Sequence, residues 1–188
     1  ILMCKGEIYG RVNSDDLLAE GAVQKVVDYF VSHPDVDIVY GECPLVDEHG
    51  SSFRGRFLKV IRDFYFKRLL RNWYGVLPTP TVFMKRAILD DVGLQDVSLH
   101  HAADYDLWCR IARKRYRFEY ISETLAKFRI HSDQKSTLMK KHHAEIIQVT
   151  RRYGSWMDVL YAQSHLKYLL FRTYLGKIKW ALLENVKS

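Results

Sequence analysis

The fold is decided close to the start of the chain, where residues 6–41 read GEIYGRVNSDDLLAEGAVQKVVDYFVSHPDVDIVYG. Residues 7–12 predict a short strand that ends in a polar cluster, 13–16. Residues 19–33 carry apolar side chains at the spacing of one helix face, which predicts a helix with one buried side. The β-branched run 36–40 predicts a second strand. Strand, helix and strand in this order favour an α/β layer.

Further strands and helices are expected along the rest of the chain. Strands are predicted at 81–84, 117–121 and 125–130, and residues 44–46 are expected to lead into a turn at 48–50. Helices are predicted at 63–71 and 104–115, and a short helix is predicted to end at Val92. From about residue 140 onward the pattern is helical, with breaks at Gly154 and Gly176. Residues 51–60 are expected to form a loop.

Composition limits the class of protein. The 188 residues are 48% hydrophobic and 13% aromatic, which suffices for a packed core and excludes wholesale disorder. The cysteines Cys4, Cys43 and Cys109 show neither zinc spacing nor a secreted disulfide pattern, so a reducing, cytoplasmic location is expected. No apolar run reaches the ~18 residues that span a bilayer.

The net charge of +7 is unevenly spread. Residues 1–109 carry 12 Lys and Arg against 16 Asp and Glu, whereas residues 110–188 carry 17 against 6. The C-terminal part therefore faces an anionic partner, such as a membrane surface, a phosphorylated substrate or nucleic acid, or presents a solvated basic face. Because the sequence has no recognised nucleic-acid motif, a basic nucleic-acid-binding domain is the weaker interpretation.

Two acidic motifs are candidates for chemistry. Asp15 and Asp16 follow the first predicted strand, where they either cap the next helix or hold a divalent cation through hard oxygen ligands. Asp104 and Asp106 open the helix predicted at 104–115 and point to roughly opposite sides of it, so they are not expected to share a role. A carboxylate in this first turn is stabilised as the anion and either caps the helix or accepts a proton.

A third candidate lies at the end of the last predicted strand, where Arg129 and His131 are close in sequence. Arg129 suits pairing with a phosphate or carboxylate. A neutral His131 suits a metal already held by carboxylates, although a surface position is the simpler interpretation.

Taken together, these motifs resemble the family 2 glycosyltransferases of the GT-A fold. The resemblance covers about residues 6–136, and its matching stretches are 6–8, 13–16, 39–41, 46–50, 79–86, 92–93, 104–110 and 125–131. It implies an α/β fold with a Rossmann-type mixed sheet flanked by helices. It also implies a metal-dependent, inverting, hexosyltransferase-type enzyme that moves a sugar from a nucleoside diphosphate donor to an acceptor hydroxyl in polysaccharide or glycan biosynthesis.

The resemblance also implies roles for single residues. Asp16 matches the metal ligand, with Mn²⁺ or Mg²⁺ as the cation, and Asp15 matches a contact to the ribose or a second contact to the metal. Asp104 matches the general base. His131 takes the place of a residue that touches metal or diphosphate. Arg129, which suits a phosphate by its own chemistry, is placed with Asp15 among the donor-binding residues.

By the same resemblance, the chain divides into residues 1–139, the C-terminal part of a GT-A domain, and residues 140–188, a helical C-terminal extension. The strands that bind the nucleotide in family members are expected to precede residue 1, so the chain is interpreted as N-terminally truncated. An inactive GT-A-like fragment that acts as an interaction module remains the main alternative.

The expected partners follow from this assignment. They are a nucleoside diphosphate sugar donor and a saccharide or lipid-linked acceptor, without nucleic acid. The tail mixes aromatic, aliphatic and basic residues around 168–180, which suits either peripheral contact with the inner face of an anionic membrane or packing on the catalytic domain.

Overall fold

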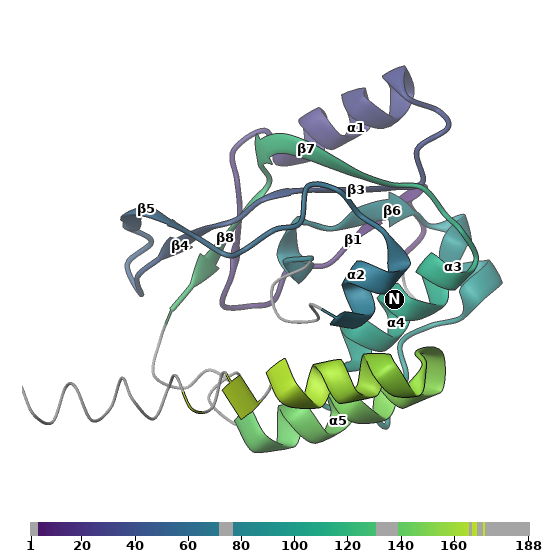
Figure 1. Cartoon of the computed structure of the whole chain (residues 1–188). Helices are drawn as coiled ribbons and strands as arrows, with labels where there is room; N and C mark the ends of the chain where they lie inside the picture. The colour runs from purple at the N-terminus through teal and green to yellow at the C-terminus, as the bar shows by residue number, and fades with distance from the viewer. Residues whose placement is uncertain (1–3, 72–76, 131–138, 166, 169–170, 172–188) are drawn as a thin grey trace, which may run out of the picture.

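The computed structural model of the chain describes residues 4–71, 77–130, 139–165, 167–168 and 171, and shows a mixed α/β fold (Figure 1). Its strands are β1 (Ile8–Gly10), β2 (Leu17–Leu18), β3 (Ile38–Glu42), β4 (Pro44–Val46), β5 (Ser52–Phe57), β6 (Phe83–Lys85), β7 (Phe118–Thr124) and β8 (Ala126–Arg129). Its helices are α1 (Ala22–Ser32), α2 (Phe66–Arg71), the 3₁₀ turn η1 (Thr79–Thr81), α3 (Ala87–Val92), α4 (Ala103–Arg113) and α5 (Met139–Tyr153).

The strands form two mixed sheets. The first has the order β1-β6-β3-β7, in which β6 runs antiparallel to both neighbours and β3 pairs in parallel with β7. The second has the order β2-β8-β4-β5, with β4 parallel to β8. The strands of the predicted strand–helix–strand unit, β1 and β3, are therefore not neighbours in the sheet. The antiparallel strand β6, from later in the chain, lies between them.

Helices cover both faces of the first sheet, with α1 on one side and α2, α4 and α5 on the other (Figure 1). The alternation of side chains along β3 shows why. Ile38 and Tyr40 join the core cluster that contains residues of α2 to α5, whereas Val39 joins the smaller cluster under α1. A strand buried on both faces reads as a continuous apolar run, and this accounts for the sequence pattern at 36–40.

Gly41 marks a close approach between β3 and β7. A Cβ atom at this position would lie 2.5 Å from the backbone oxygen of Glu123 and 2.9 Å from the side chain of Leu125. The register between the two strands also shifts between Tyr40 and Glu42. Only glycine leaves room for this contact, which gives the Gly of the 39–41 motif a packing role.

The prediction of a loop over 51–60 is wrong, because residues 52–57 form β5. All six residues of β5 are exposed, so the strand lacks the alternation that would have identified it. It is held by antiparallel pairing to β4 across the turn that ends at Gly50, whose φ of +84° suits glycine.

The last described helices pack beneath α4 (Figure 1). α5 ends at Tyr153, Gly154 interrupts it as predicted, and residues 156–165 are again helical. The other predicted break, Gly176, lies outside the described residues. Within the described part of the chain, no helix combines the length and apolar character needed to cross a membrane.

Candidate functional site

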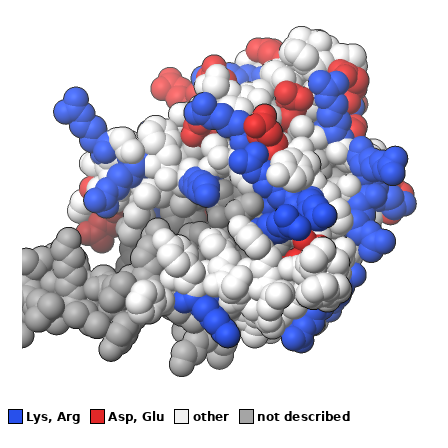
Figure 2. Space-filling view, in the orientation of Figure 1, with Lys and Arg blue, Asp and Glu red and all other residues white. Residues whose placement is uncertain are grey.

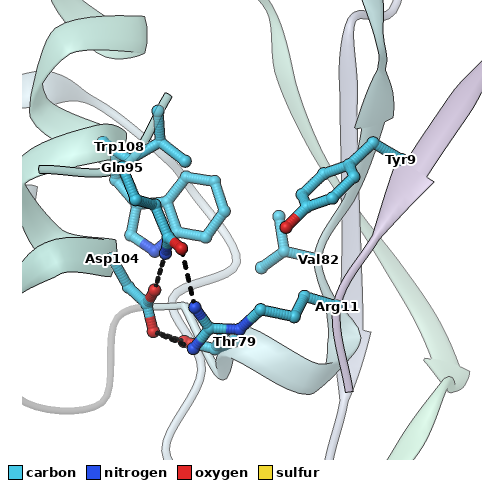
Figure 3. A pocket seen from close by; sticks show the side chains of 8 residues that line it. Tyr9, Arg11, Thr79, Val82, Gln95, Asp104 and Trp108 are labelled. Carbon is cyan, nitrogen blue, oxygen red and sulfur yellow. Dashed lines mark hydrogen bonds and ion pairs between the residues drawn. The ribbon is translucent and has the colours of Figure 1, made fainter. Parts of the chain in front are cut away.

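The carboxylate of Asp104 lies in the first turn of α4 and is bound by three side-chain donors (Figure 3). Arg11 Nη2 donates to Oδ2 at 2.9 Å, and Thr79 Oγ1 donates to the same oxygen at 2.9 Å. Gln95 Nε2 donates to Oδ1. Four elements therefore converge on this carboxylate, since Arg11 follows β1, Thr79 begins η1 and Gln95 follows α3.

Asp104, Gln95 and Trp108 lie on one side of a small pocket, Tyr9 and Val82 lie on the other, and Arg11 extends from the side of Tyr9 to reach Asp104 (Figure 3). Two aromatic side chains, Tyr9 and Trp108, contribute apolar surface. The eight lining residues are Tyr9, Arg11, Thr79, Val82, Gln95, Asp104, Leu107 and Trp108. Its volume is about 10 Å³, close to that of a single water molecule, so it can receive one polar group of a ligand and not a whole ligand.

The hydrogen bonds at Asp104 leave capacity for a further donor. A carboxylate offers about four acceptor positions on its two oxygens. Arg11 and Thr79 occupy two positions on Oδ2, and Gln95 occupies one on Oδ1. The side chain of Asp104 keeps 26% of its surface exposed, so the carboxylate is not sealed from solvent.

Arg11 is the cationic centre of the pocket. Besides Asp104, its guanidinium donates to Gln95 Oε1 at 3.0 Å, which closes a ring of three side chains. It also makes a long contact of 3.5 Å with Asn13 Oδ1, and Asn13 Nδ2 donates to Asp16 Oδ2 at 3.0 Å. A polar path therefore runs from Asp104 to the acidic pair.

Tyr9 contributes a neutral hydroxyl to the pocket. Burial raises its pKa above the usual value, the nearby charge of Arg11 lowers it, and that of Asp104 raises it. The net shift is upward, so the phenol stays protonated at neutral pH and can donate a hydrogen bond to a ligand.

Asp106 points away from this pocket, which confirms the prediction that it and Asp104 lie on opposite sides of α4. Its side chain is 2% exposed. Arg110 Nε pairs with Oδ2 at 2.9 Å, while Arg152 Nη1 and the hydroxyl of Tyr153 reach Oδ1 at 3.3 and 2.9 Å. Asp106 therefore joins α4 to α5.

The second acidic motif forms a separate corner beside β8. Asp16 is buried, with Oδ2 bound by Asn13 and Oδ1 accepting the backbone N–H of Arg129 at 3.2 Å. Burial raises the pKa of Asp16, and the hydrogen bonds from Asn13 and Arg129 only partly offset it. The alternative that this motif caps a helix is wrong, because β2 follows it and α1 begins only after Gly21.

Arg129 holds the loops around this corner together. Its Nε donates to the backbone oxygen of Asp15 at 2.8 Å, and its Nη1 donates to the backbone oxygen of Glu48. The guanidinium thus binds two backbone carbonyls. The other predicted metal ligand, His131, lies outside the described residues.

The described side chains of this corner do not form a metal site by themselves. Among the residues that the structure describes, no group of three or more His, Cys, Asp or Glu side chains is arranged to hold a metal. Asp16 offers hard oxygen atoms that each accept one hydrogen bond and keep a second lone pair. Magnesium-type sites often use one or two carboxylates and complete their coordination with substrate phosphates and water.

Sequence reasoning did not single out Arg11, Thr79 or Gln95 as partners of Asp104. They lie 93, 25 and 9 residues from it along the chain, so only the tertiary fold brings them together. The nearest signal was the quoted stretch 79–86, which contains Thr79. Arg11 stands in the predicted first strand, where a single charged residue reads as solvent-facing.

Comparison with known proteins identifies distant glycosyltransferase relatives. An uncharacterized glycosyltransferase of Methanocaldococcus jannaschii is 26% identical over 134 residues, which covers 68% of this chain and 43% of that protein. The amylovoran biosynthesis glycosyltransferase AmsE of Erwinia amylovora is 26% identical over 132 residues, covering 69% and 47%. No family model matches the chain.

Solved structures agree with this relationship at the level of the fold. The crystal structure of S. aureus TarS superposes with a TM-score of 0.54 at 15% identity, covering 81% of this chain and 28% of TarS. TarS residues 1–349 in complex with UDP gives a TM-score of 0.51, covering 81% and 47%. The chain therefore spans less than half the length of these proteins and has a mixed α/β fold similar to that of TarS.

Proposed function

We propose that the chain is a GT-A-type, family 2-like glycosyltransferase that moves a hexose from a nucleoside diphosphate donor to an acceptor hydroxyl, with inversion at the anomeric carbon. The observation that carries the proposal is the carboxylate of Asp104, held in a pocket by three donors with one acceptor position left. The distant relatives support the transferase class.

In this proposal Asp104 is the general base. The acceptor hydroxyl donates to Oδ1 of Asp104, and its oxygen attacks the anomeric carbon from the face opposite the diphosphate. The new glycosidic bond forms as the bond between the anomeric carbon and the diphosphate oxygen breaks, and the proton stays on Asp104. Fixed partners at Arg11, Thr79 and Gln95 keep the carboxylate oriented, which lowers the entropic cost of reaching the reactive geometry.

The aromatic residues line the pocket without offering a stacking surface. Tyr9 and Trp108 are only 7% and 6% exposed, so they form its apolar lining, and the hydroxyl of Tyr9 can donate to one substituent of an acceptor. Arg11 adds a positive charge beside the base. We therefore assign this pocket to the acceptor side of the reaction.

The donor diphosphate is assigned to the corner of Asp15 and Asp16. There a Mn²⁺ or Mg²⁺ ion would neutralise the diphosphate and stabilise its departure. Asp16 is the proposed ligand, with Asp15 on the ribose or as a second ligand, and Arg129 keeps the loop of Asp15 in place. TarS was solved with UDP, so a uridine diphosphate sugar is the first donor to test.

The test is acceptor-dependent release of nucleoside diphosphate from a panel of UDP and GDP sugars in the presence of Mn²⁺. We expect the wild-type chain to turn over one donor, and the Asp104→Asn and Asp16→Asn variants to lose this activity. Asp90→Asn, which changes an exposed carboxylate on α3, is the matched control and keeps it. Activity in Asp104→Asn equal to wild type would contradict the proposal and favour an interaction module.

We also propose that the helix of residues 156–165 contacts an anionic membrane surface. Its solvent side is apolar, with exposed fractions of 75% for Trp156, 58% for Leu160 and 44% for Tyr161. In Figure 2, uncharged atoms cover the area where Figure 1 draws this helix, and Lys and Arg side chains border it. Residues 140–188 carry nine Lys and Arg against three Asp and Glu, so their charge complements anionic lipid.

Vesicle flotation tests this contact with the full chain. We expect binding to vesicles that contain phosphatidylserine, weaker binding to neutral vesicles, and loss of binding in the Trp156→Ser/Leu160→Ser double variant. Equal flotation of the variant and the wild type would remove the membrane assignment. Loss of a dimer in the variant, measured by sedimentation, would instead identify a second copy as the occupant.

A further inference from the structure

The start of α4 lacks the residues that normally cap a helix. The N-cap position is Ala102, which makes no side-chain cap hydrogen bond. Three residues later, where a capping box places Glu or Gln to bind the backbone N–H of the N-cap, the residue is Tyr105. The backbone N–H of Ala102 therefore has no side-chain acceptor within the first turn, and a side chain of another element can take that place.

Glu145 on α5 supplies the acceptor. Its carboxylate accepts the backbone N–H of His101 at 2.7 Å, of Ala102 at 2.9 Å and of His100 at 3.2 Å. These bonds fix three consecutive residues directly ahead of α4. Glu145 thus performs across two helices the task that the third helical residue performs in a capping box.

The charge state of Glu145 suits this role. Burial acts to raise its pKa, but the hydrogen bonds from the backbone N–H groups of His101, Ala102 and His100, together with the charge of His101, lower it further than burial raises it. The net pKa lies below the usual value for glutamate. The carboxylate is therefore ionised at neutral pH, and charge-assisted hydrogen bonds are the stronger kind.

Two further contacts from α5 fix the first turn of α4. The hydroxyls of Tyr105 and Thr150 lie 3.1 Å apart in a buried hydrogen bond. Tyr153 and Arg152 bind Asp106. Glu145 binds residues 100–102, before Asp104 in the sequence, and α5 binds residues 105 and 106, after it. Contacts from α5 therefore fix the chain on both sides of Asp104.

From this geometry we infer that Glu145 is a positioning residue for Asp104, and that α5 orients the base toward the pocket rather than only covering the core. The inference rests on the proposed function of Asp104. Glu145 is not among the residues that line the pocket, so it acts through the backbone of residues 100–102.

The expected effect is on the chemical step rather than on binding. Without Glu145, the residues ahead of α4 lose three backbone acceptors, and Asp104 samples positions displaced from its three partners in the pocket. A misplacement of about 1 Å can cost about 100-fold in rate even when its cause lies outside the reacting groups.

The experiment compares Glu145→Ala and Glu145→Gln with the wild-type full chain, with Arg151→Gln as a control on the exposed side of the same helix. We expect kcat to fall about 10- to 100-fold in Glu145→Ala, with KM for donor and acceptor unchanged. Glu145→Gln keeps one oxygen acceptor and recovers part of the lost kcat. Amide exchange at His101 and Ala102, measured by NMR, speeds up in both variants and not in the control.

A wild-type kcat in Glu145→Ala, or a loss of rate that only follows the loss of folded protein, would overturn the inference. If Glu145→Ala does not fold, Glu145→Gln decides by the same criteria. Absence of turnover in the wild-type chain would count against the proposed function instead. The positioning role is then judged from the side-chain carboxyl ¹³C resonance of Asp104, which must move in Glu145→Gln but not in Arg151→Gln; an unmoved resonance overturns it.

Discussion

The pocket around Asp104 and the corner around Asp16 are both acidic motifs near element ends, yet the fold uses them differently. Asp104 is partly exposed and bound by three side chains from distant parts of the chain. Asp16 is buried and bound mainly by its near neighbour Asn13 and by a strand backbone. The first arrangement leaves a carboxylate partly open to solvent, whereas the second encloses one among its hydrogen-bond partners.

The same contrast exists within a single helix turn, between Asp104 and Asp106. The carboxylate of Asp104 stays partly exposed to solvent, whereas that of Asp106 is buried among three partners from α4 and α5. Two carboxylates two residues apart therefore have different surroundings: Asp106 is structural, and Asp104 is the one to which we assign a chemical role. The comparison yields predictions that separate loss of activity from loss of stability.

The largest expected effect is the loss of stability in Asp106→Ala. The substitution leaves Arg110 and Arg152 without their shared carboxylate in a site that is 2% exposed. Because Arg110 keeps its bonds to the backbone oxygens of residues 92–94 and Arg152 keeps its pair with Asp96, the expected cost is that of buried donors losing an acceptor, about 3 kcal/mol. Urea denaturation should show this loss, and Asp104→Asn should lose less than about 1 kcal/mol because its ion pair is partly exposed. Equal losses in the two variants would remove the distinction between them.

The next effect is on activity, in Arg11→Met. Removing the cation beside Asp104 should lower kcat/KM about 10- to 100-fold, or about 1.4 to 2.7 kcal/mol. Stability should change by less than about 1 kcal/mol, since exposed ion pairs contribute little. Lys25→Met is the matched control. It breaks the partly exposed ion pair between Lys25 on α1 and Glu123 on β7. An activity loss of the same size in the control would contradict the role of Arg11.

A third prediction concerns the donor corner. Asp16→Asn should weaken Mn²⁺-dependent binding of UDP about 10-fold or more, because an amide is a poor ligand for a hard cation. Folding should be little affected, since the amide oxygen still accepts the backbone N–H of Arg129. Isothermal titration measures the binding, with Asp28→Asn on α1 as control. Unchanged metal-dependent binding in Asp16→Asn would place the cation elsewhere.

The smallest effect is on the pH dependence of stability, through Asp96. Hydrogen bonds from the side chain of Ser98 and from Arg152 lower the pKa of Asp96 from 3.8 to about 2. A lowered pKa contributes stability that is present above pH 3.8 and is lost as the pH falls toward 2. Asp96→Asn should therefore show a shallower fall of Tm between pH 4 and pH 2. A parallel curve for the variant would show that these bonds do not stabilise the fold.

Parts of the fold could be predicted from the sequence because the signal was local. The helical spacing of apolar residues predicted α1 and α4, and the β-branched run predicted β3. β5 was missed because none of its residues is buried, so pairing with β4 alone defines it. β2 was missed because it has only two residues, and these count as a strand because they pair with β8.

The candidate site was predictable only in its acidic residues. Asp104 and Asp106 could be assigned to different sides of a helix because helix geometry fixes their angle. The contacts around the start of α4 could not be predicted, because Arg11 binds Asp104 and Glu145 binds the backbone of residues 100–102 from distant parts of the chain. The fold assembles these contacts, and no spacing in the sequence encodes them.

The most direct test of the base assignment is the turnover of Asp104→Ala with and without added formate. If Asp104 accepts the proton of the acceptor, kcat should fall about 100- to 10,000-fold in the variant. Formate, a small carboxylate that fits the vacated position, should restore part of the rate in proportion to its concentration and leave the wild type unaffected. Turnover by Asp104→Ala at the wild-type rate without formate would contradict the account.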